Sequence, residues 1–255
     1  MRRICTKMVL KALERGELEL FYQPQVHVRS NSIVGLEALL RWKHPRRGNI
    51  APHAFLSVVE RTDSMIRLGN WIIECVCTQN KAWQNGGFPE IPVAVNVSAH
   101  QLENGNILPF VISALKSTGL PPEFLELEIT ESIAIRNVKE VAKTLEALKQ
   151  TGIRIAIDDF GTQYASFGYI KDLPIDILKI DKCFIDEIGS NHKAEAILLS
   201  IVSLADKLHI QLVAEGVETK KQMVFLSDIG CNVIQGFYYY RPMPASEITK
   251  LLSKR

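Results

Sequence analysis

The chain has 255 residues, 47% of them hydrophobic, which is enough to bury one large core, and its 30 basic and 28 acidic residues leave a formal net charge of +2. A charge this close to zero lacks the electrostatic signature of a protein that binds duplex nucleic acid or a membrane surface. No apolar stretch reaches the ~20 residues of a membrane span, and no apolar signal core follows the first residues, so we expect a soluble, cytoplasmic protein.

Apolar segments recur along the chain and alternate with helical patterns. We expect strands at residues 18–26, 33–41, 91–98, 125–130, 154–158, 177–181, 211–215 and 233–237. We expect helices at residues 54–62, 65–85, 107–117, 138–151, 193–208, 220–229 and 245–252. The first two strands are joined by Arg29–Ser32, which is too short for a crossover helix, so they should form an antiparallel hairpin.

The later strands, from the third onward, are apolar on both faces, as strands are when helices cover a parallel sheet. Eight strands with interleaved helices predict an α/β fold, a TIM-like (β/α)8 barrel with an antiparallel first strand pair. We assign residues 1–17 to an N-terminal lead-in helix and residues 18–255 to the barrel domain. No linker-like or low-complexity segment divides the chain further.

Asp158 and Asp159 stand side by side where the apolar run 154–157 ends. Adjacent carboxylates repel each other unless cations lie between them, so the pair predicts a bound divalent metal. Four other apolar segments also end in oxygen-bearing side chains, namely Asn96, Glu128, Glu215 and Gln235. A barrel gathers the carboxyl ends of its strands at one face, and the alternation along residues 93–98 turns Asn96 inward. These side chains are therefore expected to meet in one site.

The tripeptide Glu37-Ala38-Leu39 lies within the segment GLEALLRW at residues 35–42. Further motifs, one before this segment and the others after it, lie at residues 21–24, 95–98, 126–132, 158–162, 178–181, 214–219, 235–236 and 241–243. Together these motifs resemble the EAL domain, a family of cyclic di-GMP phosphodiesterases, over nearly the whole chain. The resemblance implies an EAL-type barrel that hydrolyses cyclic di-GMP to linear pGpG in bacterial second-messenger signalling.

The residues and the resemblance agree on a metal site. Mg²⁺ and Mn²⁺ prefer oxygen ligands, and four different strands supply them through Glu37, Asn96, Glu128 and Asp158. Asp158 and Asp159 can bridge to a second ion. Two divalent cations about 4 Å apart can hold an attacking water and neutralise charge on both oxygens of an in-line displacement at phosphorus.

The resemblance also implies roles for the remaining site residues. Lys179 would position or polarise the water, and Glu215 would be a metal-linked or general-base residue, so that the expected catalytic set is Lys179, Glu215 and Glu37. The expected substrate contacts are Gln23, Leu39, Arg41 and Gln235. Glu131 would brace the loop after Asp159. The resemblance further implies a homodimer and, in the full-length protein, preceding sensory or GGDEF domains.

Each residue also has a structural interpretation. Glu37 could pair with Arg41 on one strand face, and Lys179 could pair with Asp181. Glu126 lies deeper than Glu128 and is interpreted as structural, and Glu218 is interpreted as orienting its loop. Five acids at one end of a barrel are costly to bury without cations, which favours the metal site. The six histidines have no metal-binding spacing, and the five cysteines, without a Cys-x-x-Cys pair, are expected to be buried, reduced thiols.

One position departs from the family pattern, because Gln163 stands after Thr162 where the family usually has glycine. Glutamine tolerates fewer backbone conformations than glycine, so the resemblance implies lowered or partner-dependent activity. A second functional class therefore stays open, a weak or inactive cyclic di-GMP receptor that signals to a protein partner. A third class, a barrel used only for protein contacts, is disfavoured by the intact acidic set.

Overall fold

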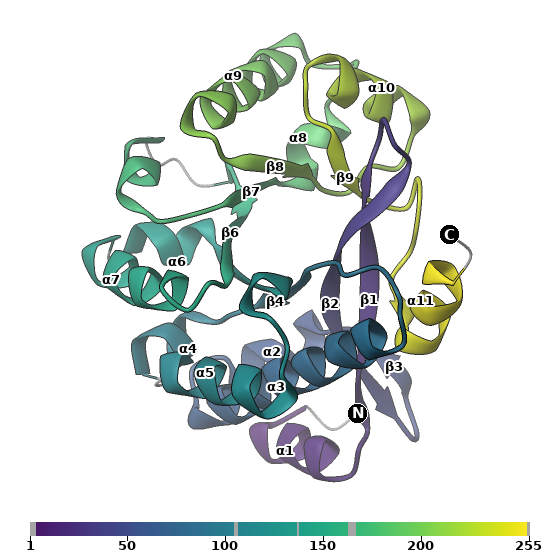
Figure 1. Ribbon diagram of the computed structural model, residues 1–255, viewed down its shortest axis with the longest axis vertical. Helices are drawn as coiled ribbons and strands as arrows, with labels where there is room; N and C mark the ends of the chain where they lie inside the picture. Colours follow the sequence, from purple (N-terminus) through teal and green to yellow (C-terminus); the bar gives the residue numbers. More distant parts are fainter. Residues whose placement is uncertain (1–3, 105–106, 137, 163–166, 254–255) are drawn as a thin grey trace.

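The computed structural model describes residues 4–104, 107–136, 138–162 and 167–253 (Figure 1). Eight of its strands form a closed ring: β1 (Leu18–His27), β2 (Ser32–His44), β4 (Val93–Asn96), β5 (Leu125–Thr130), β6 (Arg154–Phe160), β7 (Ile177–Ile180), β8 (Gln211–Ala214) and β9 (Val233–Gln235). β1 is antiparallel to both of its ring neighbours, β2 and β9, and the other ring pairs are parallel. The predicted TIM-like barrel with an antiparallel first strand pair is confirmed.

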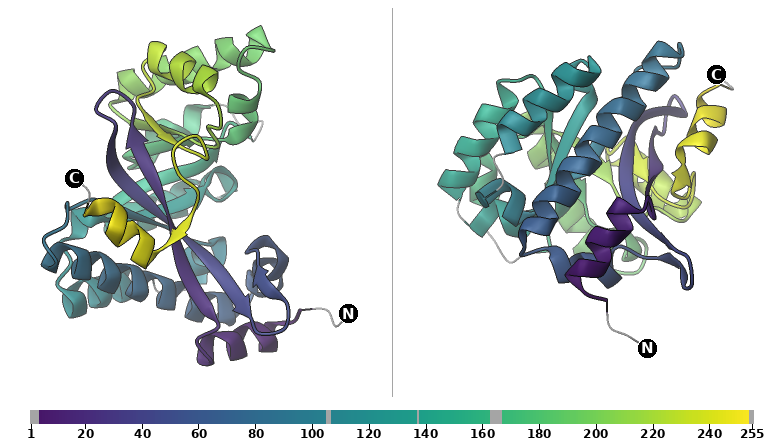
Figure 2. Two further views of the ribbon diagram at one scale, coloured as in Figure 1. Left: turned by 90° about the vertical axis from the view of Figure 1, so that its right-hand side faces the viewer. Right: turned by 90° about the horizontal axis from the view of Figure 1, so that it is seen from below.

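Helices surround this ring. They are α1 (Thr6–Glu14), α2 (His53–Val59), α3 (Asp63–Asn85), α4 (Ala99–Asn104), α5 (Ile107–Thr118), α6 (Glu131–Arg136), α7 (Val138–Lys149), α8 (Lys182–Asp186), α9 (His192–Leu208), α10 (Lys220–Asp228) and α11 (Ala245–Leu252), with 3₁₀ turns η1 (Pro122–Phe124) and η2 (Phe167–Asp172). α1 leads into β1, and α11 packs beside it (Figure 2). None of the described helices combines the length and the apolar character that crossing a bilayer requires.

Among the described α-helices and strands, five short ones were not predicted. α4, α6 and α8 have six residues or fewer, too short for a helical hydrophobic period to show. Strands β3 (Gly48–Ile50) and β10 (Met243–Pro244) only extend the sheet beside β2 and β1. The helix predicted at 54–62 ends at Val59, because Thr62 adopts an extended backbone as the N-cap of α3.

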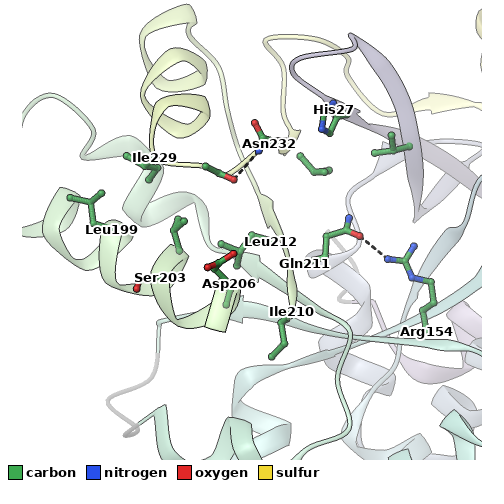
Figure 3. Close-up of a pocket in the computed structure, with 15 residues that line it drawn as sticks. His27, Arg154, Leu199, Ser203, Asp206, Ile210, Gln211, Leu212, Ile229 and Asn232 are labelled. Atoms are coloured by element: carbon green, nitrogen blue, oxygen red, sulfur yellow. Dashed lines mark hydrogen bonds between the residues drawn. The ribbon is translucent and has the colours of Figure 1, made fainter. Parts of the chain in front are cut away.

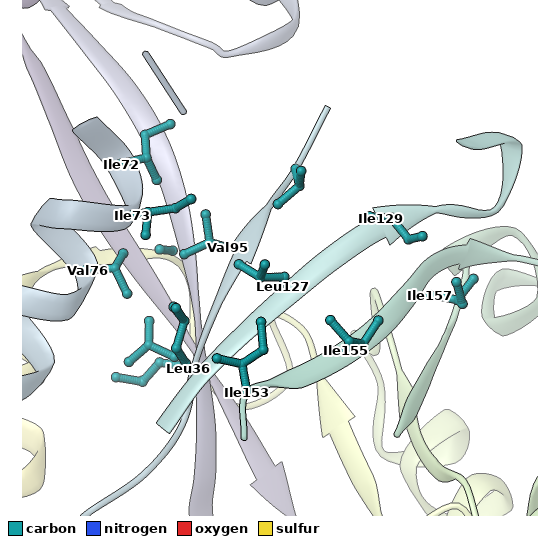
Figure 4. Packing of buried hydrophobic residues seen from close by; sticks show 14 of the residues in the cluster. Leu36, Ile72, Ile73, Val76, Val95, Leu127, Ile129, Ile153, Ile155 and Ile157 are labelled. Atoms are coloured by element: carbon teal, nitrogen blue, oxygen red, sulfur yellow. The ribbon is translucent and has the colours of Figure 1, made fainter. Parts of the chain in front are cut away.

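The main core fills the space between the barrel and its helices. Leu127, Ile155 and Ile157 point outward from β5 and β6, and Ile73 of α3 lies in the same apolar layer (Figure 4). Each of these side chains is at most 1% exposed. The helices that cover the outer face of the sheet explain why the outward residues of the parallel strands are apolar.

The inside of the barrel is divided into two levels. A small apolar cluster of Ala156, Ile177, Val213 and Val233 lies on the four strands β6, β7, β8 and β9. Two residues further along each of these strands the inward side chain is polar, because alternate residues share a face: Asp158, Lys179, Glu215 and Gln235. Strand alternation therefore places this layer of polar side chains, which we call the polar level, next to the apolar cluster inside the barrel.

The cysteines correct one expectation. The structure contains no disulfide among them, but only Cys77 and Cys231 are buried. Cys75 is half-buried, and Cys5 and Cys183 are exposed. The two exposed thiols lie at the start of α1 and in the short α8, where no apolar layer covers them.

Candidate active site

A single buried ammonium group lies at the centre of the polar level. Lys179 of β7 is 0% exposed, and its Nζ lies 2.7 Å from Glu128 Oε1 and 2.7 Å from Glu215 Oε1. The same Nζ is 3.3 Å from Glu37 Oε2 and 3.5 Å from Asp158 Oδ1. Burial lowers the pKa of Lys179, but the four carboxylates outweigh burial and raise it well above its usual value. The structure thus joins acids from four different segments around one cation.

Glu37 of β2 is held by neutral donors as well as by Lys179. Asn96 Nδ2 donates to Glu37 Oε1 at 2.9 Å, and Gln235 Nε2 donates to Glu37 Oε2 at 2.5 Å. Burial opposes ionisation of Glu37, yet Lys179, Gln235 and Asn96 outweigh burial and lower its pKa. Glu37 is therefore an ionised carboxylate whose direction is fixed from two sides.

We call the five carboxylates Glu37, Glu128, Asp158, Asp159 and Glu215 the acid ring. Among them, Glu128 of β5 is buried with the least hydrogen bonding. It is 0% exposed, and neither carboxylate oxygen accepts a hydrogen bond of good geometry from the described residues, although Oε1 is within ion-pair distance of Lys179. Burial raises the pKa of Glu128 well above its usual value, with Lys179 opposing this shift. Carboxylate oxygens buried without hydrogen bonds are costly unless a cation coordinates them. Glu128 therefore fits a metal ligand.

Asp159 adds a fifth carboxylate, which lies beside Asp158 and Glu215 near the mouth of the barrel. Asp158, Asp159 and Glu215 each place one carboxylate oxygen within 4.8 Å of the others. Burial, with Asp158 and Asp181 nearby, raises the pKa of Asp159 to about 6. Burial likewise raises the pKa of Glu215 to about 8, although Lys179 opposes the shift. A divalent cation between these oxygens would offset the burial, and the smaller repulsion from Asp158, that raise both pKa values.

The charges of the ring also fit metal binding. Glu37, Glu128, Asp158, Asp159 and Glu215 set five carboxylates against the one ammonium of Lys179. The excess of four negative charges in the fully ionised ring equals the charge of two divalent cations. The oxygen-only donor set is the one that Mg²⁺ and Mn²⁺ prefer.

A cavity of about 300 Å³ opens beside the ring. Gln23, Leu39 and Gln235 line it, as expected of substrate contacts, and Gln235 Nε2 also donates to Gln23 Oε1 at 3.3 Å. Arg41 is not among the lining residues. Its Nη1 donates to Leu40 O at 2.8 Å, and its guanidinium lies 5.7 Å from the ring of Phe21.

Five residues of this cavity were not among the expected contacts. They are Lys182, Gly216, Glu218, Gly236 and Phe237. Lys182 Nζ lies 3.2 Å from Glu218 Oε1, and Phe237 is 47% exposed with the guanidinium of Arg241 4.1 Å from its ring. Lys182 and Phe237 directly follow the motifs at 178–181 and 235–236, so their position in the sequence was the available signal.

Two structural interpretations of the site residues are wrong for the described residues. Asp181 does not pair with Lys179 but caps α8, where its Oδ1 accepts the backbone N–H of Cys183 at 2.9 Å. Glu37 forms its ion pair with Lys179, and no ion pair joins it to Arg41. Glu218, interpreted as orienting its loop, pairs with Lys182.

Glu131 occupies the first position of α6, next to the loop after β6. Its Oε2 accepts the backbone N–H of Gly161 at 2.9 Å, and its Oε1 accepts the hydroxyl of Tyr169 at 3.0 Å. The expected bracing partner is therefore in contact with the loop. Gln163, the departure from the family pattern, lies outside the described residues.

A larger hollow of about 770 Å³ lies at the opposite, amino-terminal end of the barrel (Figure 3). Arg154 and Gln211 line it and are joined by a hydrogen bond of 3.0 Å from Arg154 Nη2 to Gln211 Oε1. It contains none of the ring acids. This larger hollow is therefore separate from the acidic candidate site.

Glu126 is a buried acid that pairs with Arg154, one of the residues that line this hollow. It is 2% exposed, its Oε2 lies 3.8 Å from Arg154 Nη1, and burial raises its pKa from 4.5 to about 7, with Arg154 opposing the shift. Between these two pH values the folded protein binds more protons at Glu126 than the unfolded chain does. Stability attributable to Glu126 therefore falls as the pH rises through this window.

Replacing Glu126 by glutamine should consequently stabilise the fold at about pH 8, by up to about 3 kcal/mol for a shift from 4.5 to about 7. The gain should shrink towards zero at about pH 4, where the carboxyl group is neutral in both states. Urea unfolding of both proteins in chelator at the two pH values measures it. Glu247→Gln on the exposed face of α11 is the control, and a Glu126→Gln variant that is less stable at about pH 8 would contradict the interpretation.

Known proteins resemble this chain over nearly its whole length. The EAL domain family model matches residues 6–242. The bifunctional diguanylate cyclase/cyclic di-GMP phosphodiesterase MucR of Pseudomonas aeruginosa is 43% identical over 238 residues, which are 93% of this chain and 35% of MucR. The cyclic di-GMP phosphodiesterase NbdA of the same organism is 36% identical over 242 residues, 95% of this chain and 31% of NbdA. The chain thus spans about a third of the length of these relatives.

Solved structures agree in fold. The MucR phosphodiesterase in complex with c-di-GMP has a TM-score of 0.91 and 42% identity, over 95% of this chain and 98% of that one. The EAL enzyme Bd1971, with cAMP and cyclic di-GMP bound, has a TM-score of 0.91 and 29% identity, over 97% of this chain and 68% of that one. The family model covers the acid ring, the loop after β6 and the Glu37-Ala38-Leu39 strand alike, and this chain belongs to the EAL domain family.

Proposed function

We propose that this protein is a metal-dependent phosphodiesterase that hydrolyses cyclic di-GMP to linear pGpG. The main support for the proposal is the set of acids around Lys179, in which neither buried oxygen of Glu128 accepts a hydrogen bond from the residues that the structure describes. MucR and NbdA, which share this family, are named as cyclic di-GMP phosphodiesterases, and MucR has been solved with c-di-GMP.

Two divalent cations, Mg²⁺ or Mn²⁺, would be held by the ring. Glu37, Asn96, Glu128 and Asp158 are the proposed ligands of one ion, and Asp158 and Asp159 extend the site to a second. When bound, the cations polarise an attacking water and neutralise charge at the scissile phosphate. Lys179 keeps Glu128 and Glu215 in place through its two 2.7 Å contacts.

The protein residues then have separate tasks in the displacement. The water oxygen forms a bond to phosphorus while the bond from phosphorus to the 3′-oxygen breaks, which leaves the 5′-phosphate of pGpG. Glu215, which Lys179 at 2.7 Å and the bound cations would keep ionised, accepts the proton of the water, and a solvent water protonates the 3′-oxygen as it leaves as a hydroxyl. Gln235 and Asn96 hold Glu37 in its ionised state throughout.

Substrate contacts are proposed at the cavity beside the ring. Gln23, Leu39 and Gln235 line this cavity, and we assign them to the dinucleotide. Arg41 lies outside the lining but is on the same face of β2 as Glu37 and Leu39, and its planar fork of donors suits a phosphate.

Arg41→Ala should therefore raise the KM for cyclic di-GMP about tenfold, through loss of a charge-assisted contact, and change Mn²⁺ affinity little. Steady-state titration of substrate at saturating Mn²⁺ measures the KM, and calorimetry measures the metal affinity. Arg29→Ala, in the hairpin turn at the far end of β1, is the control. An unchanged KM would remove Arg41 from the substrate contacts.

The wider setting is also a proposal. Because the curated relatives are about three times longer than this chain, we propose that it acts beside further domains, sensory or GGDEF, as a homodimer in the cytoplasm. The receptor class predicts binding of cyclic di-GMP without turnover. The complete acid ring favours turnover over that class.

The test is to incubate the purified protein with cyclic di-GMP and Mg²⁺ or Mn²⁺ and to separate the products by chromatography. We expect pGpG with either cation and none in excess chelator. Ca²⁺ should support binding with little turnover, because its larger, flexible coordination shell holds water and phosphate less well in line. Tight binding without product in either cation would instead support the receptor class.

A further inference from the structure

One carboxylate contacts both Gly161, directly after β6, and Tyr169 of η2. Glu131 is 1% exposed, and its two oxygens take different partners. Oε2 accepts the backbone N–H of Gly161 at 2.9 Å, two residues after Asp159. Oε1 accepts the hydroxyl of Tyr169, in η2, at 3.0 Å. The direction in which Glu131 presents Oε2 therefore depends on what holds Oε1.

Asp159 needs this support because its backbone is unfavourable. Its φ of 55° lies in the left-handed region, which residues with a Cβ adopt at a cost. The loop after it is held by hydrogen bonds to Asp159 O, from Thr162 N at 3.3 Å and from Thr162 Oγ1 at 2.9 Å. Gly161 lies between Asp159 and Thr162 in the sequence, and its backbone N–H donates to Glu131. The orientation of the Asp159 carboxylate thus depends on the loop being held.

The backbone of Gly161 itself is closely packed. Its φ is +94°, and a Cβ built on it would lie 2.5 Å from a ring carbon of Phe184. The backbone therefore packs directly against α8 on one side and donates to Glu131 on the other. A rotation of Glu131 would move the donor, the loop and Asp159 together.

Tyr169 is suited to fix Glu131. Its side chain is buried at 8% exposure, so few waters can compete for the carboxylate. Burial, and then the neighbouring Glu131, raise the pKa of Tyr169, so its hydroxyl stays protonated and remains a donor. A hydroxyl that donates to an ionised carboxylate forms one of the stronger hydrogen bonds in proteins.

We propose that Tyr169 is a positioning residue of the metal site, whose hydroxyl fixes Glu131 so that Glu131 can hold Gly161 and, through it, Asp159. The inference rests on the proposed function, because it takes Asp159 as part of that site. Tyr169 contacts neither metal nor substrate in this arrangement and acts only through Glu131.

Tyr169→Phe tests this directly, since it removes one oxygen and keeps the buried ring. We expect Mn²⁺ affinity, measured by calorimetry without substrate, to fall roughly tenfold, as loss of a charge-assisted hydrogen bond predicts. Glu131→Ala should weaken Mn²⁺ binding at least as much. The double variant should bind Mn²⁺ no more weakly than Glu131→Ala alone, because Tyr169 has no effect without Glu131.

Thr249→Val is the matched control. It also removes one hydroxyl, here the acceptor 2.9 Å from Trp83 Nε1 between α3 and α11, and it should leave Mn²⁺ affinity unchanged. If Glu131→Ala does not fold, as judged by circular dichroism, Glu131→Met keeps most of the side-chain volume without an acceptor oxygen and takes its place in the cycle.

Unchanged Mn²⁺ affinity in Tyr169→Phe would overturn the inference. So would an equal loss in the presence and absence of Glu131, because Tyr169 would then act by another route. If Tyr169→Phe weakens Mn²⁺ binding as expected but the parent protein does not hydrolyse cyclic di-GMP, the proposed function fails and the positioning role of Tyr169 stands.

Discussion

Replacing Lys179 by methionine is expected to abolish hydrolysis and to destabilise the metal-free protein. The Lys179 ammonium is fully buried and lies within 3.5 Å of four carboxylates, so its loss leaves those acids without their shared counter-charge. Breaking a buried ion pair from one side typically costs about 3–5 kcal/mol. Turnover should fall at least about 1000-fold, because the residue that holds Glu128 and Glu215 in place is gone.

Turnover at saturating Mn²⁺ and urea unfolding in chelator measure the two effects of Lys179→Met. The control is Lys207→Met, on the exposed side of α9. The destabilisation should be smaller at about pH 5 than at about pH 8, because acids with raised pKa values are then protonated and need no counter-charge. A variant that keeps turnover within tenfold of the parent would show that Lys179 is dispensable to the ring.

Glu128→Gln is expected to separate activity from stability. Turnover should fall at least about 1000-fold, because the proposed metal ligand Glu128 loses its charge. The free energy of unfolding in chelator at about pH 8 should not fall, because burial already raises the pKa of Glu128 well above its usual value and the amide removes a charge that the metal-free fold tolerates poorly.

The matched control for Glu128→Gln is Glu146→Gln, an exposed position on α7, which should leave both quantities unchanged. Kinetic assays and urea unfolding provide the two measurements. Near-normal turnover in Glu128→Gln would exclude Glu128 from the metal ligands, and a large loss of stability would show that Glu128 is ionised and structurally required without metal.

Strand alternation explains how much of this site could be predicted from the sequence. The parity of Asn96, Glu128 and Lys179 places them inside the barrel once the strands are recognised, and the short turn at Arg29–Ser32 predicts the antiparallel hairpin. Parity does not say which inward groups touch. The pairing of Lys179 with four acids at once, rather than with Asp181, depends on the closure of the ring.

Contacts between segments that share no periodic sequence pattern could not be predicted from the sequence. Tyr169 meets Glu131 across 38 positions of sequence, and nothing in either local pattern predicts the contact. Lys182 and Phe237 reach the cavity because they directly follow strand-end motifs, while Arg41 turns to the carbonyl of its neighbour Leu40. Side-chain directions at strand ends and in loops depend on tertiary packing, which overrides local preference.

The most direct test of the central claim is the electron paramagnetic resonance spectrum of the protein titrated with Mn²⁺. A site in which Asp158 and Asp159 bridge two ions predicts that two Mn²⁺ bind per chain and couple magnetically. The resolved hyperfine pattern of isolated Mn²⁺ should therefore be lost as the second equivalent binds, and should persist in Asp159→Asn. A single uncoupled Mn²⁺ per chain at saturation would contradict a two-metal site.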